Sequence, residues 1–110
     1  MDSEVAANRE ERNHRLAEEA CELLQACGYK FSELIAMAFW VYTKDPGSPE
    51  EEMGDVMSSL TALATAHGVD LNHACDMTLA RNWKNIDKIR EKHRNKALKS
   101  AARIQVPANG

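Results

Sequence analysis

The chain is a 110-residue polypeptide that is 44% hydrophobic and 28% charged and has a formal net charge of -3, a composition typical of a single globular domain. No apolar run reaches the roughly 18 residues needed to cross a membrane, and the amino terminus has no secretory hydrophobic region, so we expect a cytoplasmic protein without a membrane partner. The acidic balance also argues against nucleic acid as a partner, because domains that bind nucleic acid usually carry a basic surplus.

Helical spacing of apolar residues recurs along the chain, and no five-residue segment alternates like a half-buried strand, so we predict an all-α fold. The first helix should run from near residue 3 to residue 27, with Gly28 just past its end. Its apolar stripe comprises Leu16, Ala20, Leu23, Leu24 and Cys27. The same segment carries an acidic cluster, Glu18-Glu19-x-x-Glu22.

The second predicted helix runs from Ser32, a candidate N-cap, to about Lys44. Its centre, residues 34–41, reads LIAMAFWV and is apolar on all sides. Such a helix is expected to have neighbours on several sides, as in a bundle core or an oligomer interface.

The third predicted helix opens with Ser48 as N-cap, Pro49 at its first position and an acid at its third. It should continue to a stop at residues 67–68. Near its start lies a second acidic cluster, Glu51-Glu52-x-x-Asp55. If Glu51 reaches back to the cap, Glu52 and Asp55 are the pair that remains to bind something else. Gly54, an internal helix glycine that costs about 1 kcal/mol relative to alanine, indicates a close approach by a ligand or by another helix.

The fourth predicted helix begins near Asp70 and extends at least to Glu91. Helical geometry places Asn82 and Asn85 on its inward side, where polar groups need partners. They either bond each other and backbone carbonyls or line a pocket for sugar and phosphate. Lys84 points away from this side and Lys88 lies at its flank.

The predicted elements make one helical domain, residues 1–100, followed by a flexible tail, residues 101–110. Only about eighty residues are expected to be packed helix, a size at which core burial is marginal. We therefore expect a four-helix bundle completed by self-association into a homodimer or homotetramer.

The two acidic clusters predict a divalent metal site. Residues three apart share a helix face, so Glu19 with Glu22 and Glu52 with Asp55 each present two carboxylates. Both pairs flank the same side of their helices. Bringing them together without a cation is costly, since two like charges about 4 Å apart repel by roughly 4 kcal/mol at an effective dielectric near 20. The alternative is that these are ordinary exposed acids. The histidines show no ligand spacing, which favours an all-oxygen site for Mg²⁺ or Mn²⁺.

Three segments resemble the MazG-like, all-α nucleotide pyrophosphohydrolases. The segment LAEEACELLQACG from Leu16 looks like the family's first motif, Glu-Glu-x-x-Glu. The segment EEMGDVMSSLTALATAHGVDL from Glu51 looks like its second, and ARNWKNIDKIREKH from Ala80 is similar to the close of the domain. The resemblance covers residues 15–93, and it implies a MazG-like bundle.

The resemblance implies a Mg²⁺-dependent enzyme that cleaves a nucleoside triphosphate, ribo or deoxy, to the monophosphate and pyrophosphate. It implies that the metal ligands and catalytic carboxylates are Glu19, Glu22, Glu52 and Asp55, and that Asn82 and Lys84 contact the nucleotide. Asn85 and Lys88 join them as candidate substrate-binding residues. The general base stays open between Glu18 and a ligand oxygen.

Two other functions stay open beside this one. A phosphoribosyl-ATP pyrophosphohydrolase would share the same helical acidic plan. A noncatalytic helical interaction module would retain the acidic clusters as surface features.

Overall fold

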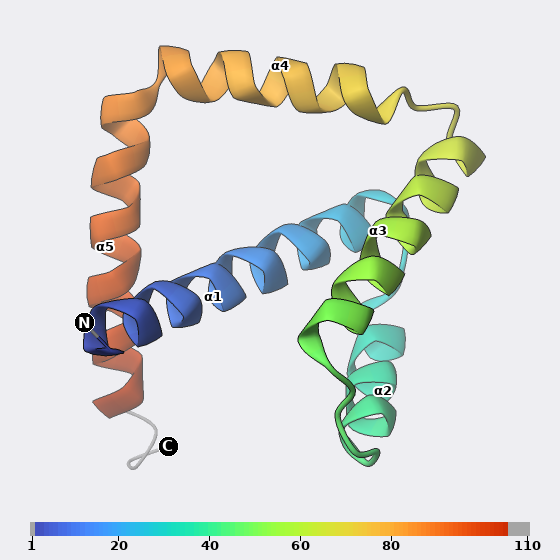
Figure 1. Ribbon diagram of the computed structural model, residues 1–110, viewed down its shortest axis with the longest axis horizontal. Coiled ribbons are helices and arrows are strands. Elements are labelled where there is room, and N and C mark those ends of the chain that lie inside the picture. Colours follow the sequence, from blue (N-terminus) through green and yellow to red (C-terminus); the bar gives the residue numbers. More distant parts are fainter. Residues whose placement is uncertain (1, 106–110) are drawn as a thin grey trace. The chain divides into compact units, whose positions relative to one another are not determined.

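The computed structural model describes the backbone of residues 2–105 and the side chains of residues 3–96 and 98. Every regular element in this part of the chain is a helix, which confirms the all-α prediction (Figure 1). The helices are α1 (Asp2–Ala26), α2 (Phe31–Tyr42), α3 (Pro49–Ala66), α4 (Leu71–Lys84) and α5 (Ile86–Gln105). None of these helices is both long enough and apolar enough to cross a membrane.

The helices fall into two compact units, Met1–Gly47 with α1 and α2, and Ser48–Gly110 with α3, α4 and α5. Very little of the described chain is buried. Ala64 in α3 is its only buried residue, and eighteen large hydrophobic side chains are exposed. The four-helix bundle and its completion by other copies stay predictions.

Helix α1 ends at the glycine that the sequence predicts. The Gly28 N–H donates to Gln25 O at 3.0 Å, and the Tyr29 N–H donates to Leu24 O at 2.9 Å. These two bonds form a Schellman motif, which requires a residue in the left-handed conformation just past the helix end. Gly28 supplies it with φ of 85°.

Helix α2 begins one residue earlier than predicted, and the assignment of Ser32 as N-cap is wrong. Lys30 occupies the N-cap with extended dihedral angles, φ -77° and ψ 147°, and makes no side-chain capping bond. Its carbonyl already accepts from the Leu34 N–H at 3.0 Å, so Ser32 falls inside the first turn. At the other end the Thr43 hydroxyl donates to Trp40 O at 2.6 Å and closes the helix.

Helix α3 has the start and stop that its sequence predicts. The Ser48 hydroxyl accepts from the Glu51 N–H at 3.2 Å, and Pro49 is the first helical residue. The helix ends in a second Schellman motif around Gly68, in which the Val69 N–H donates to Ala64 O at 2.8 Å. These local signals fix the position of the second acidic cluster in the first two turns.

The fourth predicted helix is wrong in one respect, because it is divided at Asn85 into α4 and α5. Asp70 caps α4 as expected, accepting from the His73 N–H at 3.0 Å. The Asn85 amide donates to Arg81 O at 3.0 Å, and its backbone leaves the helical region with φ -115° and ψ 26°. Asparagine side chains compete in this way for backbone partners. In Figure 1 the two helices meet at a sharp bend. Residues 101–105 of the predicted tail continue α5, and residues 106–110 lie outside the described part.

Candidate metal centre

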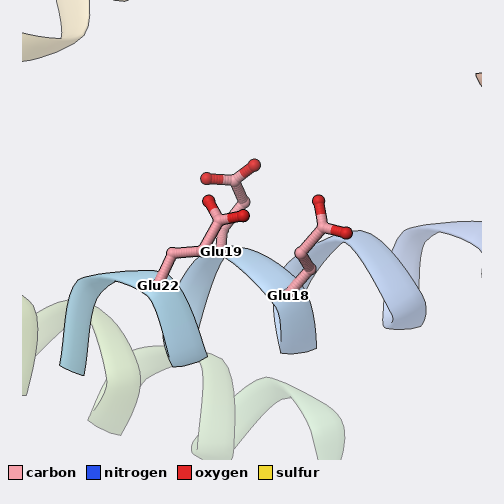
Figure 2. A group of neighbouring side chains, drawn as sticks. All are labelled: Glu18, Glu19 and Glu22. Atoms are coloured by element: carbon pink, nitrogen blue, oxygen red, sulfur yellow. The ribbon is translucent and has the colours of Figure 1, made fainter. Parts of the chain in front are cut away.

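Three carboxylates of α1 gather on one side of the helix (Figure 2). One oxygen from each of Glu18, Glu19 and Glu22 lies within 4.8 Å of the other two. The spacing follows from helix geometry, because turns of about 100° per residue place the three positions within an arc of about 100°. Glu18 is half-buried, and Glu19 and Glu22 are exposed.

The arrangement concentrates negative charge, and the Arg15 guanidinium partly offsets it. Each pair of charges at this separation repels by about 1 kcal/mol in water. The Arg15 guanidinium lies 3.8 Å from a Glu19 carboxylate oxygen, one turn earlier on α1. The Arg15 side chain is 33% exposed and the Glu19 side chain 58%, so solvent screens this ion pair.

The donor set suits a hard divalent cation. Carboxylate oxygens are the ligands that Mg²⁺ and Mn²⁺ prefer. Two oxygens bound to the same Mg²⁺ lie up to about 4.2 Å apart, since each metal–oxygen distance is about 2.1 Å. Small side-chain rotations would therefore bring the three carboxylates of α1 to a common ion.

The structure places Glu18 in this group beside the two predicted ligands, Glu19 and Glu22. The sequence interpretation kept Glu18 only as a possible proton acceptor. A signal was present in the spacing, because Glu18 and Glu22 stand four residues apart and so share a helix face.

The other two predicted ligands, Glu52 and Asp55, lie on α3 in the second unit, and both are exposed. Ser48 and Pro49 set their place in the helix, and three residues of separation put both on one face. The convergence of this pair with the acids of α1 stays a prediction.

Gly54, between the two acids of α3, lies in open space. Apart from its two chain neighbours and the backbone of its own helix, no heavy atom of the described residues would lie within 4 Å of a Cβ atom built on it. Packing within the described part of the chain therefore does not explain why a glycine occupies this helical position.

The predicted substrate-binding residues lie on both sides of the bend in the second unit. Asn82 is half-buried on α4, Lys84 is its exposed last residue, and Lys88 is exposed on α5. The Asn85 amide nitrogen already serves the helix end by donating to Arg81 O. This bond uses one of the two amide hydrogens of Asn85, so a ligand contact would use the second hydrogen or the amide oxygen.

Comparison with known proteins identifies no relative. No protein-family model, curated protein or solved structure matches this chain.

Proposed function

We propose that the protein is a Mg²⁺-dependent pyrophosphohydrolase that converts nucleoside triphosphates, ribo or deoxy, to the monophosphate and pyrophosphate. The observation that supports this proposal best is the meeting of Glu18, Glu19 and Glu22 within 4.8 Å on one side of α1. The motif resemblance described above supplies the reaction class.

In this proposal, Glu19 and Glu22 of α1 act with Glu52 and Asp55 of α3 as the metal ligands. Mg²⁺ is the proposed cofactor, and Mn²⁺ could replace it. When bound, the metal would neutralise phosphate charge and lower the pKa of a coordinated water.

The remaining polar residues would hold the substrate. The ammonium groups of Lys84 and Lys88 would offset charge on the phosphates, and the Asn82 and Asn85 amides would bond the sugar or phosphate oxygens. A water oxygen would bond to phosphorus as the bond to the pyrophosphate oxygen breaks. A carboxylate, Glu18 or a metal ligand, would accept the water proton.

We also propose that the protein works as a homodimer or homotetramer in the cytoplasm, with neither nucleic acid nor membrane as a partner. The exposed apolar side chains support self-association. The cysteines Cys21, Cys27 and Cys75 are free, as is usual in a reducing compartment.

The test is turnover by the full chain with each common nucleoside and deoxynucleoside triphosphate and Mg²⁺, measured as pyrophosphate and monophosphate release. We expect Glu19→Ala and Glu52→Ala to lower kcat/KM by roughly 100-fold or more, because each removes a metal ligand. Glu10→Ala and Glu50→Ala are matched controls, each removing an exposed glutamate from the same helices, and they should retain turnover.

Other results of the same assay would select one of the two alternative functions. Turnover of phosphoribosyl-ATP without turnover of common triphosphates would select the phosphoribosyl-ATP pyrophosphohydrolase. No turnover with any nucleotide would overturn the enzyme and favour a noncatalytic interaction module, a function that the exposed apolar surface also fits.

A further inference from the structure

Helix α2 presents apolar side chains in every direction around its axis. Residues 34–42 are nine consecutive apolar residues, and at about 100° per residue they leave no gap wider than about 60°. No residue of α2 is buried. A helix on the surface of a domain needs an apolar stripe only somewhat wider than 100°. Helix α2 therefore needs neighbours on several sides.

Summed around the whole helix, the exposed apolar area of α2 is similar to one side of a standard interface. Its four aromatic residues are widely exposed: Phe31 by 76%, Phe39 by 74%, Trp40 by 56% and Tyr42 by 89%. Since such side chains bury about 150–250 Å² each, their exposed parts amount to roughly 600 Å². Three half-exposed aliphatic residues, Ile35, Met37 and Val41, add to this area. A standard interface buries about 800 Å² on each partner.

The low charge of α2 favours a second copy of the chain as the partner that covers its exposed apolar surface. Glu33, in the first turn, is the only charged residue within α2, and the Lys44 ammonium, just past the end of the helix, lies 3.3 Å from the centre of the Trp40 ring. These two charges lie at opposite ends of the helix, and the residues between them, 34–42, are all apolar. Two copies of α2 could therefore pack together about a twofold axis through this apolar, self-complementary stretch without burying an unpaired charge. Helices of the same chain can cover one or two sides of α2, and its all-round apolar surface leaves a further side for the partner.

We propose that α2 is the surface through which two copies of this chain associate, with α2 of one copy packing against α2 of the other. This inference specifies the interface for the self-association proposed above. It does not depend on nucleotide hydrolysis.

Sedimentation velocity of the full chain over about a hundredfold range of concentration tests the proposal. The wild type should show a reversible dimer, and Phe39→Glu should raise its dissociation constant roughly 30-fold or more, as loss of an interface hot spot does. Trp83→Glu is the matched control, because Trp83 is 75% exposed but lies on α4. It should leave the dissociation constant within about threefold of the wild-type value.

A second variant and a second measurement guard against misfolding of Phe39→Glu. Tyr42→Glu changes the last residue of α2, and it should weaken the dimer while circular dichroism shows unchanged helicity. Hydrogen exchange of residues 31–42 should slow as the wild-type concentration rises. A wild type that is monomeric throughout, or exchange in this segment that is independent of concentration, would overturn the proposal. So would equal weakening by Trp83→Glu.

Turnover measured on the same samples separates this inference from the proposed activity. A dimer through α2 without pyrophosphate release would support the interface and overturn the hydrolase. Pyrophosphate release by a protein that stays monomeric would support the hydrolase and overturn the interface.

Discussion

At the scale of single residues, the Glu19 carboxylate can pair with the Arg15 guanidinium or bind a cation together with its two neighbouring carboxylates. This carboxylate lies 3.8 Å from the Arg15 guanidinium and belongs to the three-carboxylate group with Glu18 and Glu22. The arginine lowers the negative potential that would attract a cation. Because the pair is well exposed, its own contribution to stability is small, in the range of about 0–1 kcal/mol.

We predict that Arg15→Gln tightens the binding of Mn²⁺, used as a probe for Mg²⁺. Loss of one positive charge about 4 Å away is worth up to about 1 kcal/mol in water, or about fivefold in the dissociation constant. Titration calorimetry at low salt measures this change. Arg9→Gln removes an exposed arginine that lies nearer the amino end of α1 and further from the three carboxylates, so it should have a smaller effect. Weaker Mn²⁺ binding by Arg15→Gln would contradict a cation site at the three carboxylates.

At the scale of the elements, the ends of the helices are set by short-range hydrogen bonds. Gly28 closes α1 at positive φ, whereas Gly54 is an ordinary helical residue, and no described side chain or other helix lies within 4 Å of the place of its missing Cβ. The two glycines therefore respond to alanine for opposite reasons. The left-handed conformation costs an L-residue roughly 1–2 kcal/mol, and alanine in a helix interior gains about 1 kcal/mol over glycine.

We predict that Gly28→Ala lowers the free energy of unfolding by about 1–2 kcal/mol and that Gly54→Ala raises it by about 1 kcal/mol. Urea unfolding followed by circular dichroism measures both variants. A loss of stability in Gly54→Ala would mean that another helix packs closely against α3 at this point. Lower turnover in Gly54→Ala at unchanged or higher stability would instead indicate that the substrate or metal approaches there.

At the scale of the whole molecule, the described residues form helices without forming much of a core. A helix of 12 residues such as α2 is marginal in water by itself, so its stability has to come from packing. With Ala64 as the only buried residue of the described chain, the eighteen exposed large side chains are available to other copies. Folding and association should therefore be linked.

We predict that the thermal midpoint rises with protein concentration. Mass action over about a hundredfold range stabilises an associated state by about 2.7 kcal/mol, which corresponds to several degrees for a chain of this size. Calorimetric scans at the two ends of the range measure the shift. A midpoint that does not change, together with a monomeric mass, would mean that the chain stabilises its helices without a second copy.

The local features of this protein could be predicted from its sequence because they depend on residues close together in the chain. Ser48 and Pro49 begin α3, and Gly28 ends α1, through hydrogen bonds that span five residues or fewer. The same reasoning applies to Glu19 and Glu22, since positions three apart on a helix share a face. These short-range rules predicted the fold class and the side of α1 on which the carboxylates of Glu19 and Glu22 lie.

The start of α2 and the break at Asn85 did not follow from capping propensity or apolar periodicity. Capping propensity favoured Ser32, but the N-cap is Lys30, two residues earlier, where the backbone is extended. Apolar periodicity continued through Asn85, and it carried no signal that the amide would bond Arg81 O and end α4. The side chain of Asn85 competes there with the helix for a backbone partner.

The sequence by itself determined that this chain is helical, where its acidic clusters lie and that α2 is apolar all round. Only the three-dimensional structure decided that Asn85 separates α4 from α5 and that no side chain of α2 is buried. The physical reason is range. Helix formation, capping and the grouping of acids on one helix face act over a few residues, whereas burial and the exact ends of a helix depend on packing and on competing hydrogen bonds that periodicity does not encode.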